Sequence, residues 1–388
     1  MLHTMCDTLC GRGDAGMVFA KNSDRPVGEV QLAFPFGRRS SVGCTLRTQY
    51  LSIGDTGAHA VFLSCPTWLW GAEHGVNEFG VAIGNERVAT VHDAAQARPG
   101  LIGMDLVRLG LERARSAEEA LDVMIGLLTT HGQGGIADAA HQEAYDSSFL
   151  IADPAQAFVL DTCGADYAAA PFPGGTAISN RLAVGPAWTR ASAGLAAGED
   201  FGRFADDATP TTSADVRLAA SRRFLSTQGT RGLTPGATAA HLRDHGSGAW
   251  GTTPSVCMHG PGRSVTAASL IALLPADLAG GAPLRTYVAL GSPCVSVYVP
   301  AFPRTASGPP PFITFELSSE AMWRAADALR ARVEADPAAA PAIRAVLDPV
   351  EEELWSEADE VWARPDRWAE VGSSWGGRAL QALRSCAP

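Results

Sequence analysis

The sequence predicts an α+β fold, and three observations indicate it. Short strand-like runs lie before and after a pair of amphipathic helical segments. A hydrophobic fraction of 46% with 18% charged residues is typical of an ordered globular chain. At 388 residues the chain is long enough for one large domain with an appendage and a substantial buried core.

The first predicted element is a β-hairpin. Residues 6–10 and 17–20 are short strand-like runs, and the glycines among residues 11–16 supply a turn between them. Further strands are expected near residues 60–64 and 80–84.

Two amphipathic helices are predicted next. Residues 103–114 and 117–128 place apolar side chains three and four positions apart. Ser116 and Glu119 form a capping box at the start of the second helix, since each side chain can bond the other residue's amide. We expect both helices to pack on one face of a sheet.

The rest of the chain is predicted to contain further strands, a surface excursion and a helical C-terminal segment. Residues 194–213 are predicted to form a surface excursion that leads to a helix at about 215–226, and after the proline-rich residues 307–311 the chain becomes helical. That last segment contains five of the nine tryptophans, and residues 316–388 have 14 acidic and 8 basic side chains. Strands are expected at residues 148–152, 157–162, 176–180, 267–274 and 285–290.

Charge and composition exclude several classes of function. A net charge of −11 and a pI near 5.3 argue against nucleic acid or an anionic membrane surface as a partner. No apolar run reaches the roughly 18 residues of a membrane-spanning helix, and the N-terminus lacks the pattern of a secretory signal, so we expect a cytoplasmic protein. Eight scattered cysteines do not resemble the dense framework of small secreted domains, and we expect free thiols.

The histidines form no recognisable catalytic motif. His241 and His245 have helical i, i+4 spacing, and Cys257 or His259 would be further zinc ligands. No glutamate lies between the two histidines at the metalloprotease position. We therefore expect neither a metal nor an organic cofactor.

Cys6 is the strongest candidate for a nucleophile, although a cysteine near a chain start is most often a small core residue. It directly follows Met5, and its expected hairpin partner contains Lys21, the only lysine of the chain, together with Asp24. If translation begins at Met5, or if residues 1–5 are removed as a propeptide, Cys6 becomes N-terminal. Its own α-amine, with a pKa of about 7.7 to 8.0, is then able to accept the thiol proton.

Several segments together resemble the secernin family, which belongs with the cysteine dipeptidases of the N-terminal-nucleophile hydrolases. The resemblance covers most of residues 6–300 and implies a four-layer αββα sandwich of two antiparallel sheets with a helical C-terminal extension. The expected domains are 1–5 as propeptide or incorrectly assigned start, 6–306 as hydrolase domain, and 307–388 as proline-rich linker and helical, acidic extension. The segments that resemble the family are residues 6–8, 19–25, 66–73, 75–86, 103–113, 148–153, 178–180 and 255–259.

The resemblance also implies roles for individual residues. Bile-salt hydrolases and penicillin V acylases belong to the same superfamily, and Lys21 stands where those acylases have an arginine beside the nucleophile. Asp24 resembles the aspartate that hydrogen-bonds the N-terminal amine. Asn85 and Asn180 resemble the asparagines that line the oxyanion site.

Two further pairs remain open at this stage. Either Arg222 or Arg223 resembles a later active-site arginine, with Arg223 taken as catalytic and Arg222 as substrate-binding, although the doubled residue leaves the register open. Trp68 and Trp70 either line a substrate pocket or serve packing beside a proline.

The leading functional hypothesis is therefore a cysteine amide hydrolase, most simply a dipeptidase that acts through a thioester. Its partner would be a dipeptide or another small molecule. One alternative is an acylase or acyltransferase acting on a small N-acyl metabolite, and another is a non-hydrolytic interaction protein that docks through its tryptophan-rich acidic tail. Whether the chain forms a homo-oligomer is left open by its residues.

Overall fold

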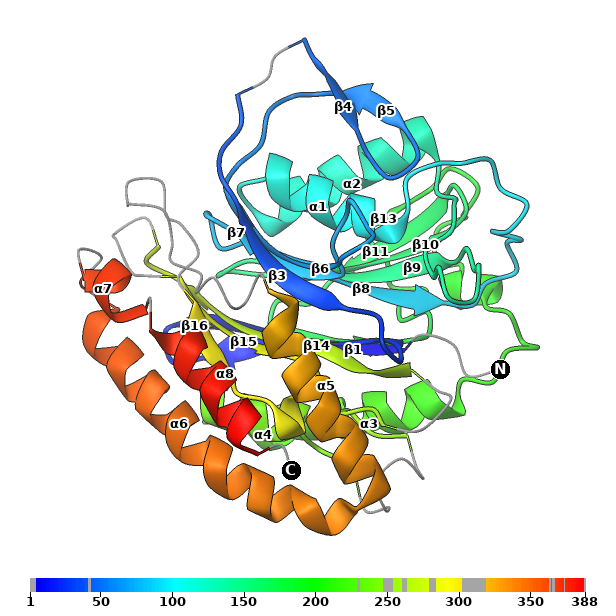
Figure 1. The fold of residues 1–388 in the computed structure, drawn as a ribbon. Helices are drawn as coiled ribbons and strands as arrows, with labels where there is room; N and C mark the ends of the chain where they lie inside the picture. The colour runs from blue at the N-terminus through cyan, green and yellow to red at the C-terminus, as the bar shows by residue number, and fades with distance from the viewer. Residues whose placement is uncertain are drawn as a thin grey trace.

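The fold is a stack of two antiparallel sheets between two layers of helices (Figure 1). The computed structural model describes residues 5–40, 43–228, 231–246, 254–259, 264–278, 284–301, 319–362, 364, 367–372 and 374–386. One sheet has eight strands with helices α1 and α2 on its outer side, and the other has six strands with the remaining helices on its outer side. This arrangement confirms the predicted four-layer αββα class.

The six-stranded sheet has the order β12-β1-β2-β14-β15-β16 and contains the predicted hairpin. The hairpin strands pair from Cys6 opposite Ser23 to Gly13 opposite Gly16, so the turn is shorter than expected. A β-bulge between Thr266 and Ala268 interrupts the pairing of β2 with β14. The strands are β1 (Cys6–Gly13), β2 (Gly16–Pro26), β12 (Gly175–Ser179), β14 (Ser264–Pro275), β15 (Arg285–Leu290) and β16 (Val299–Ala301).

The eight-stranded sheet has the order β13-β11-β10-β9-β8-β7-β6-β3. Four of its strands, β6, β8, β9 and β10, match runs expected from the sequence, whereas the other four were not expected. The strands are β3 (Gln31–Phe36), β6 (Val61–Pro66), β7 (His74–Asn77), β8 (Ala82–Val88), β9 (Asp146–Ala152), β10 (Ala157–Cys163), β11 (Asp166–Pro171) and β13 (Arg190–Ala191). A separate two-stranded sheet pairs β4 (Thr45–Arg47) with β5 (Ser52–Gly54).

Helices α1 (Gly103–Arg113) and α2 (Ala117–His131) confirm the predicted pair and share one apolar core with the eight-stranded sheet. Only half of the predicted capping box forms. The Ser116 hydroxyl accepts from the Glu119 amide at 3.1 Å, but the Glu119 carboxylate accepts from the Arg115 amide instead of that of Ser116.

The outer helices of the six-stranded sheet come from two parts of the chain. They are α3 (Thr212–Gln228), α4 (Pro235–Leu242), α5 (Glu320–Ala335), α6 (Ala340–Val361), α7 (Trp368–Gly372) and α8 (Trp375–Ser385). The C-terminal helices share one continuous apolar core with both sheets. Residues 1–4 and the predicted domain boundary at 307 lie outside the described residues.

The tryptophans of the C-terminal segment are part of this core. Trp323, Trp362, Trp368 and Trp375 are buried, and Trp355 is partly buried against the same cluster. The tryptophans therefore stabilise the packing of the helices on the sheet. Among the described residues, no helix combines the length and apolar character needed to cross a bilayer.

Candidate active site

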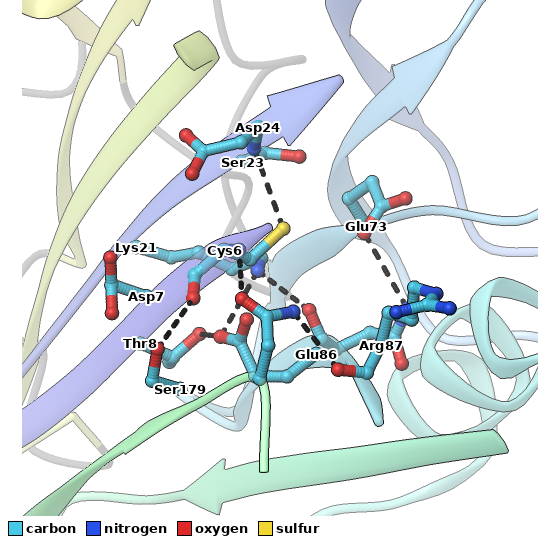
Figure 2. Close-up of polar contacts among 12 residues, drawn as sticks. Cys6, Asp7, Thr8, Lys21, Ser23, Asp24, Glu73, Glu86, Arg87 and Ser179 are labelled. Carbon is cyan, nitrogen blue, oxygen red and sulfur yellow. Dashed lines mark hydrogen bonds and ion pairs between the residues drawn. The ribbon is translucent and has the colours of Figure 1, made fainter. Parts of the chain in front are cut away.

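Cys6 lies at the first position of β1, buried between the sheets with 1% of its surface exposed. Its backbone nitrogen donates to Asn180 Oδ1 at 2.7 Å, and its sulfur accepts from the Asp24 amide at 3.4 Å. Figure 2 shows the sulfur directed toward the backbone of Asp24 on the neighbouring strand. The nitrogen and the thiol of one residue thus both have fixed positions.

A buried arginine that the sequence analysis missed organises the other side of Cys6. Arg217 on α3 places Nη1 2.9 Å from Asp24 Oδ2 and 3.1 Å from Asp7 Oδ2. Its Nη2 donates to Asn180 Oδ1 at 2.5 Å and to the carbonyl oxygen of Cys6 at 3.3 Å. One guanidinium therefore connects both aspartates to the residue that binds the Cys6 nitrogen.

Burial shifts the pKa values of the Asp7 and Asp24 carboxyl groups. Burial raises the pKa of Asp7 to about 7 and that of Asp24 to about 6, while the charge of Arg217 opposes both shifts. Asp24 Oδ1 also accepts from the Thr266 hydroxyl at 2.7 Å. The predicted bond between the Asp24 carboxylate and the free amine of Cys6 stays a prediction, since in the uncleaved chain the Cys6 nitrogen is a peptide nitrogen that donates to Asn180.

The prediction for Arg222 and Arg223 is corrected by the helix on which they lie. Both are exposed on α3, and at 3.6 residues per turn they point about 140° and about 120° away from Arg217. The buried face of α3 contains Ala214, Arg217, Leu218 and Ser221. The sequence of α3 indicates this phase only weakly, since Val216 is exposed and Ser221 is buried.

Lys21 lies beside Cys6 and is completely buried. Its Nζ donates to the backbone oxygen of Asn85 at 2.6 Å and forms an ion pair with Glu86 Oε1 at 3.2 Å. Burial raises the pKa of Glu86 to about 8, and the charge of Lys21 opposes this shift. Burial likewise raises the pKa of the Cys6 thiol, with Lys21 as the largest opposing influence.

The two predicted oxyanion asparagines differ in orientation. Asn180 turns its Nδ2 to the backbone oxygen of Arg87 at 2.9 Å, so its oxygen faces the nitrogen of Cys6. Asn85 Nδ2 lies 3.5 Å from Glu73 Oε2 and 3.3 Å from Met104 Sδ. Its Oδ1 has no hydrogen-bond partner within the described part of the chain.

Trp68 and Trp70 do not contact Cys6 in any of the described interactions. The ring of Trp70 packs under the guanidinium of Arg108, 4.3 Å from its carbon. Trp68 packs against the small cluster that contains Met104, the residue in contact with Asn85. Both residues therefore have packing contacts, and a pocket role for either one stays a prediction.

A pocket of about 420 Å³ is lined by neighbours of Cys6, although not by Cys6 itself. Its lining includes Asn180, Arg87 and Met5, the residue that precedes Cys6. Met5 is itself buried, and its sulfur accepts from the Ser213 hydroxyl at 3.2 Å. In the uncleaved chain, Met5 thus borders the space next to the candidate nucleophile.

Comparison with known proteins gives distant structural similarity, and no family model matches the chain. Similar solved structures include a mutant of the conjugated bile acid hydrolase from Clostridium perfringens, at 13% identity and TM-score 0.44 over 72% of this chain and 88% of that chain. A Caenorhabditis elegans N-acylethanolamine-hydrolyzing acid amidase ortholog has 11% identity and TM-score 0.43 over 71% and 96% of the respective chains. Penicillin V acylase from Agrobacterium tumefaciens has 11% identity and TM-score 0.42 over 74% and 82%. These similarities assign no function to this chain, and the resemblance to secernins stays a prediction.

Proposed function

We propose that this protein is a cysteine amide hydrolase in which Cys6 is the nucleophile once residues 1–5 have been removed. The observation that supports this most directly is the double anchoring of Cys6, with its nitrogen on Asn180 and its sulfur on the Asp24 amide. Any buried backbone nitrogen needs a hydrogen-bond partner, but here the partner is a side chain that would stay beside the nitrogen after cleavage. A residue that supplies both nucleophile and base needs a nitrogen held in this way, because the proton passes between these two atoms.

The first chemical step transfers the thiol proton to the freed α-amine as Cys6 Sγ attacks the substrate carbonyl. Because burial raises the pKa of the thiol, the base has to be close, and the α-amine of the same residue meets that requirement. The charge of Lys21 favours the thiolate during this transfer. Asn180 and Arg217 act as positioning residues for the amine.

The tetrahedral intermediate then collapses to a thioester. We assign the Asn85 side chain as a donor to the oxyanion, since the Asn180 amide group is engaged with Arg87. The carbon–nitrogen bond breaks, and the α-amine gives its proton to the leaving nitrogen. Water next forms the new carbon–oxygen bond, the carbon–sulfur bond breaks, and the proton of that water returns to Cys6.

The pocket next to Cys6 supports a small substrate, and a dipeptide is our first choice. Removal of Met5 would enlarge this space beside the nucleophile. Arg181 and Asp206 both line the pocket and offer opposite charges to the two ends of a zwitterion. An acylase is the second candidate, because the apolar residues Leu182, Pro210 and Ala214 also line the pocket. We place the enzyme in the cytoplasm, where its eight free cysteines would stay reduced.

The test is the intact mass of purified wild type, of Cys6→Ala and of Cys10→Ala, together with hydrolysis of dipeptide and N-acyl amino acid panels. Cys10 is a matched control, because it is also buried and lies on the same strand. Wild type and Cys10→Ala should begin at Cys6 and hydrolyse amides, whereas Cys6→Ala should be inactive. If wild-type protein retains residues 1–5 and still hydrolyses amides, the α-amine of Cys6 is not the base. If dipeptides with a blocked amine are cleaved as well as free ones, the acylase replaces the dipeptidase.

A further inference from the structure

A second cluster of cysteines and histidines is connected to the surroundings of Cys6 through Thr266, whose hydroxyl donates to Asp24 and accepts from the Met258 amide. Its ligand-type atoms, one each from His245, Cys257, His259 and Cys294, all lie within 4.8 Å of one another. His259 Nε2 is 3.5 Å from the sulfur of Cys257 and 3.2 Å from that of Cys294. The rings of His245 and His259 are 5.1 Å apart between centroids.

This set has the chemistry and spacing of a tetrahedral zinc centre. With zinc–sulfur bonds of about 2.3 Å and zinc–nitrogen bonds of about 2.0 to 2.1 Å, tetrahedral geometry places nitrogen and sulfur ligands about 3.6 Å apart. The two nitrogen–sulfur distances above are close to that value. Two thiolates with two imidazoles are typical ligands of zinc. We propose that these four residues bind a structural Zn²⁺ ion.

The surroundings of His259 support this assignment independently. Its Nδ1 lies 3.1 Å from Glu334 Oε1, while its Nε2 faces the two sulfurs. Arg330 in turn donates to the other oxygen of Glu334 at 2.5 Å. A carboxylate on the far nitrogen is the arrangement that orients metal-bound histidines in proteins.

The site is closed, which points to a structural ion and not to a catalytic one. Protein side chains supply all four positions, and three of the four residues are buried. The ligands come from distant parts of the chain: His245 follows α4, Cys257 and His259 precede β14, and Cys294 lies in a short 3₁₀ helix, η2 (Pro293–Val295). The ion would therefore hold these segments together, and Glu334 would connect them to α5.

The structure also explains why sequence spacing pointed to a different set. His241 turns away from the cluster, since its Nε2 lies 3.0 Å from the Ser221 hydroxyl and its ring stacks on Phe224 at 4.4 Å. The fourth ligand is Cys294, which lies far along the chain from the other three. No local motif contains it.

The proposal does not depend on the amide hydrolase function, and it is tested on the full chain. Elemental analysis of protein purified without chelators should give one zinc per chain. Replacement by Co²⁺ should give the intense d–d absorption of tetrahedral cobalt and a thiolate-to-metal charge-transfer band. Reduced wild-type protein that contains no zinc and takes up neither Zn²⁺ nor Co²⁺ would overturn the proposal.

Variants locate the ion. Cys294→Ser should lose zinc, whereas the matched control Cys65→Ser, at another buried thiol, should keep it. Glu334→Gln should retain the ligands but bind zinc about 10 to 100 times more weakly. Equal zinc content in Cys294→Ser and Cys65→Ser would place the metal elsewhere and contradict the assignment. Cys6→Ala should remain fully loaded, which separates this test from that of the catalytic mechanism.

Discussion

Thr266 connects two buried thiol clusters whose neighbouring side chains differ in kind. Around Cys6 the neighbours are charged, with Lys21, Asp24 and Arg217 arranged about a single sulfur. Around Cys257 the neighbours are a second thiol and two imidazoles. The comparison teaches that the surroundings decide what a buried thiol does. Fixed charges and an adjacent amine suit proton transfer, whereas thiols that face imidazoles suit a shared cation.

The largest effect is expected where the surroundings of Cys6 lose the buried Arg217. Arg217→Met leaves Asp7 and Asp24 buried without their counter-charge, and breaking such a pair costs about 3 to 5 kcal/mol. Urea unfolding should show this loss, and residues 1–5 should remain attached. The control Arg223→Met, exposed on the same helix, should change stability by no more than about 0.5 kcal/mol. If both variants lose the same amount of unfolding free energy, the assignment of Arg217 to the site is wrong.

The next effect concerns the residue that joins the two clusters. The Thr266 hydroxyl donates to Asp24 and accepts from the Met258 amide at 2.9 Å, between the two zinc ligands Cys257 and His259. Thr266→Val leaves a buried amide and a carboxylate oxygen without this partner, at a cost of about 1 to 3 kcal/mol. Both amide hydrolysis and zinc affinity should fall. An effect on one of them alone would show that the clusters are independent.

A smaller effect is expected on the rate at which the Cys6 thiol reacts when a neighbouring charge is removed. In the processed protein, Lys21→Met should slow alkylation of Cys6 by iodoacetamide about tenfold at neutral pH, corresponding to about one unit of thiol pKa. Above about pH 8, where the Glu86 carboxyl is ionised, Glu86→Gln should act in the opposite direction, because the Glu86 charge raises the same pKa. Mass spectrometry of the Cys6 peptide measures both rates. If the two variants change the rate in the same direction, charge is not the cause.

The last effect is a gradual dependence of stability on pH, which extends over about three pH units. Burial raises the pKa of Asp7 from 3.8 to about 7, so between these values the folded protein binds a proton that the unfolded chain has released. Stability contributed by this group is therefore fully present below about pH 4 and is lost as pH rises toward 7. Urea unfolding at several pH values should show that Asp7→Asn lacks this decline, at most about 1.4 kcal/mol per pH unit. Parallel profiles for wild type and variant would contradict the assignment.

Much of the fold was predictable because the local sequence pattern of many segments matches the burial of their side chains in the structure. The hairpin at Cys6 and the helices at 103–113 and 117–131 follow directly from turn residues and apolar periodicity. The strand at 31–36 was missed because its run contains a proline and lies at the edge of its sheet. The layer of C-terminal helices was predicted as helical, but its burial on the sheet depends on contacts that no local pattern contains.

The site was predictable where residues are close in sequence and not where the fold joins distant ones. Cys6, Lys21 and Asp24 share one hairpin, so their proximity follows from strand pairing. Arg217 reaches them from a helix about two hundred residues away, and the phase of that helix indicates it only weakly. Cys294 has no such signal, because its partners precede it across two strands of the sheet.

The single lysine of the chain, Lys21, is completely buried beside Cys6. Every other cationic side chain is an arginine or a histidine, so the folded surface offers no ε-amine to acylating cross-linkers or dyes. In the native protein such reagents are left with the α-amine alone. Cleavage would move this α-amine to Cys6, beside Asn180, so a change in the amount of attached label per molecule would report maturation.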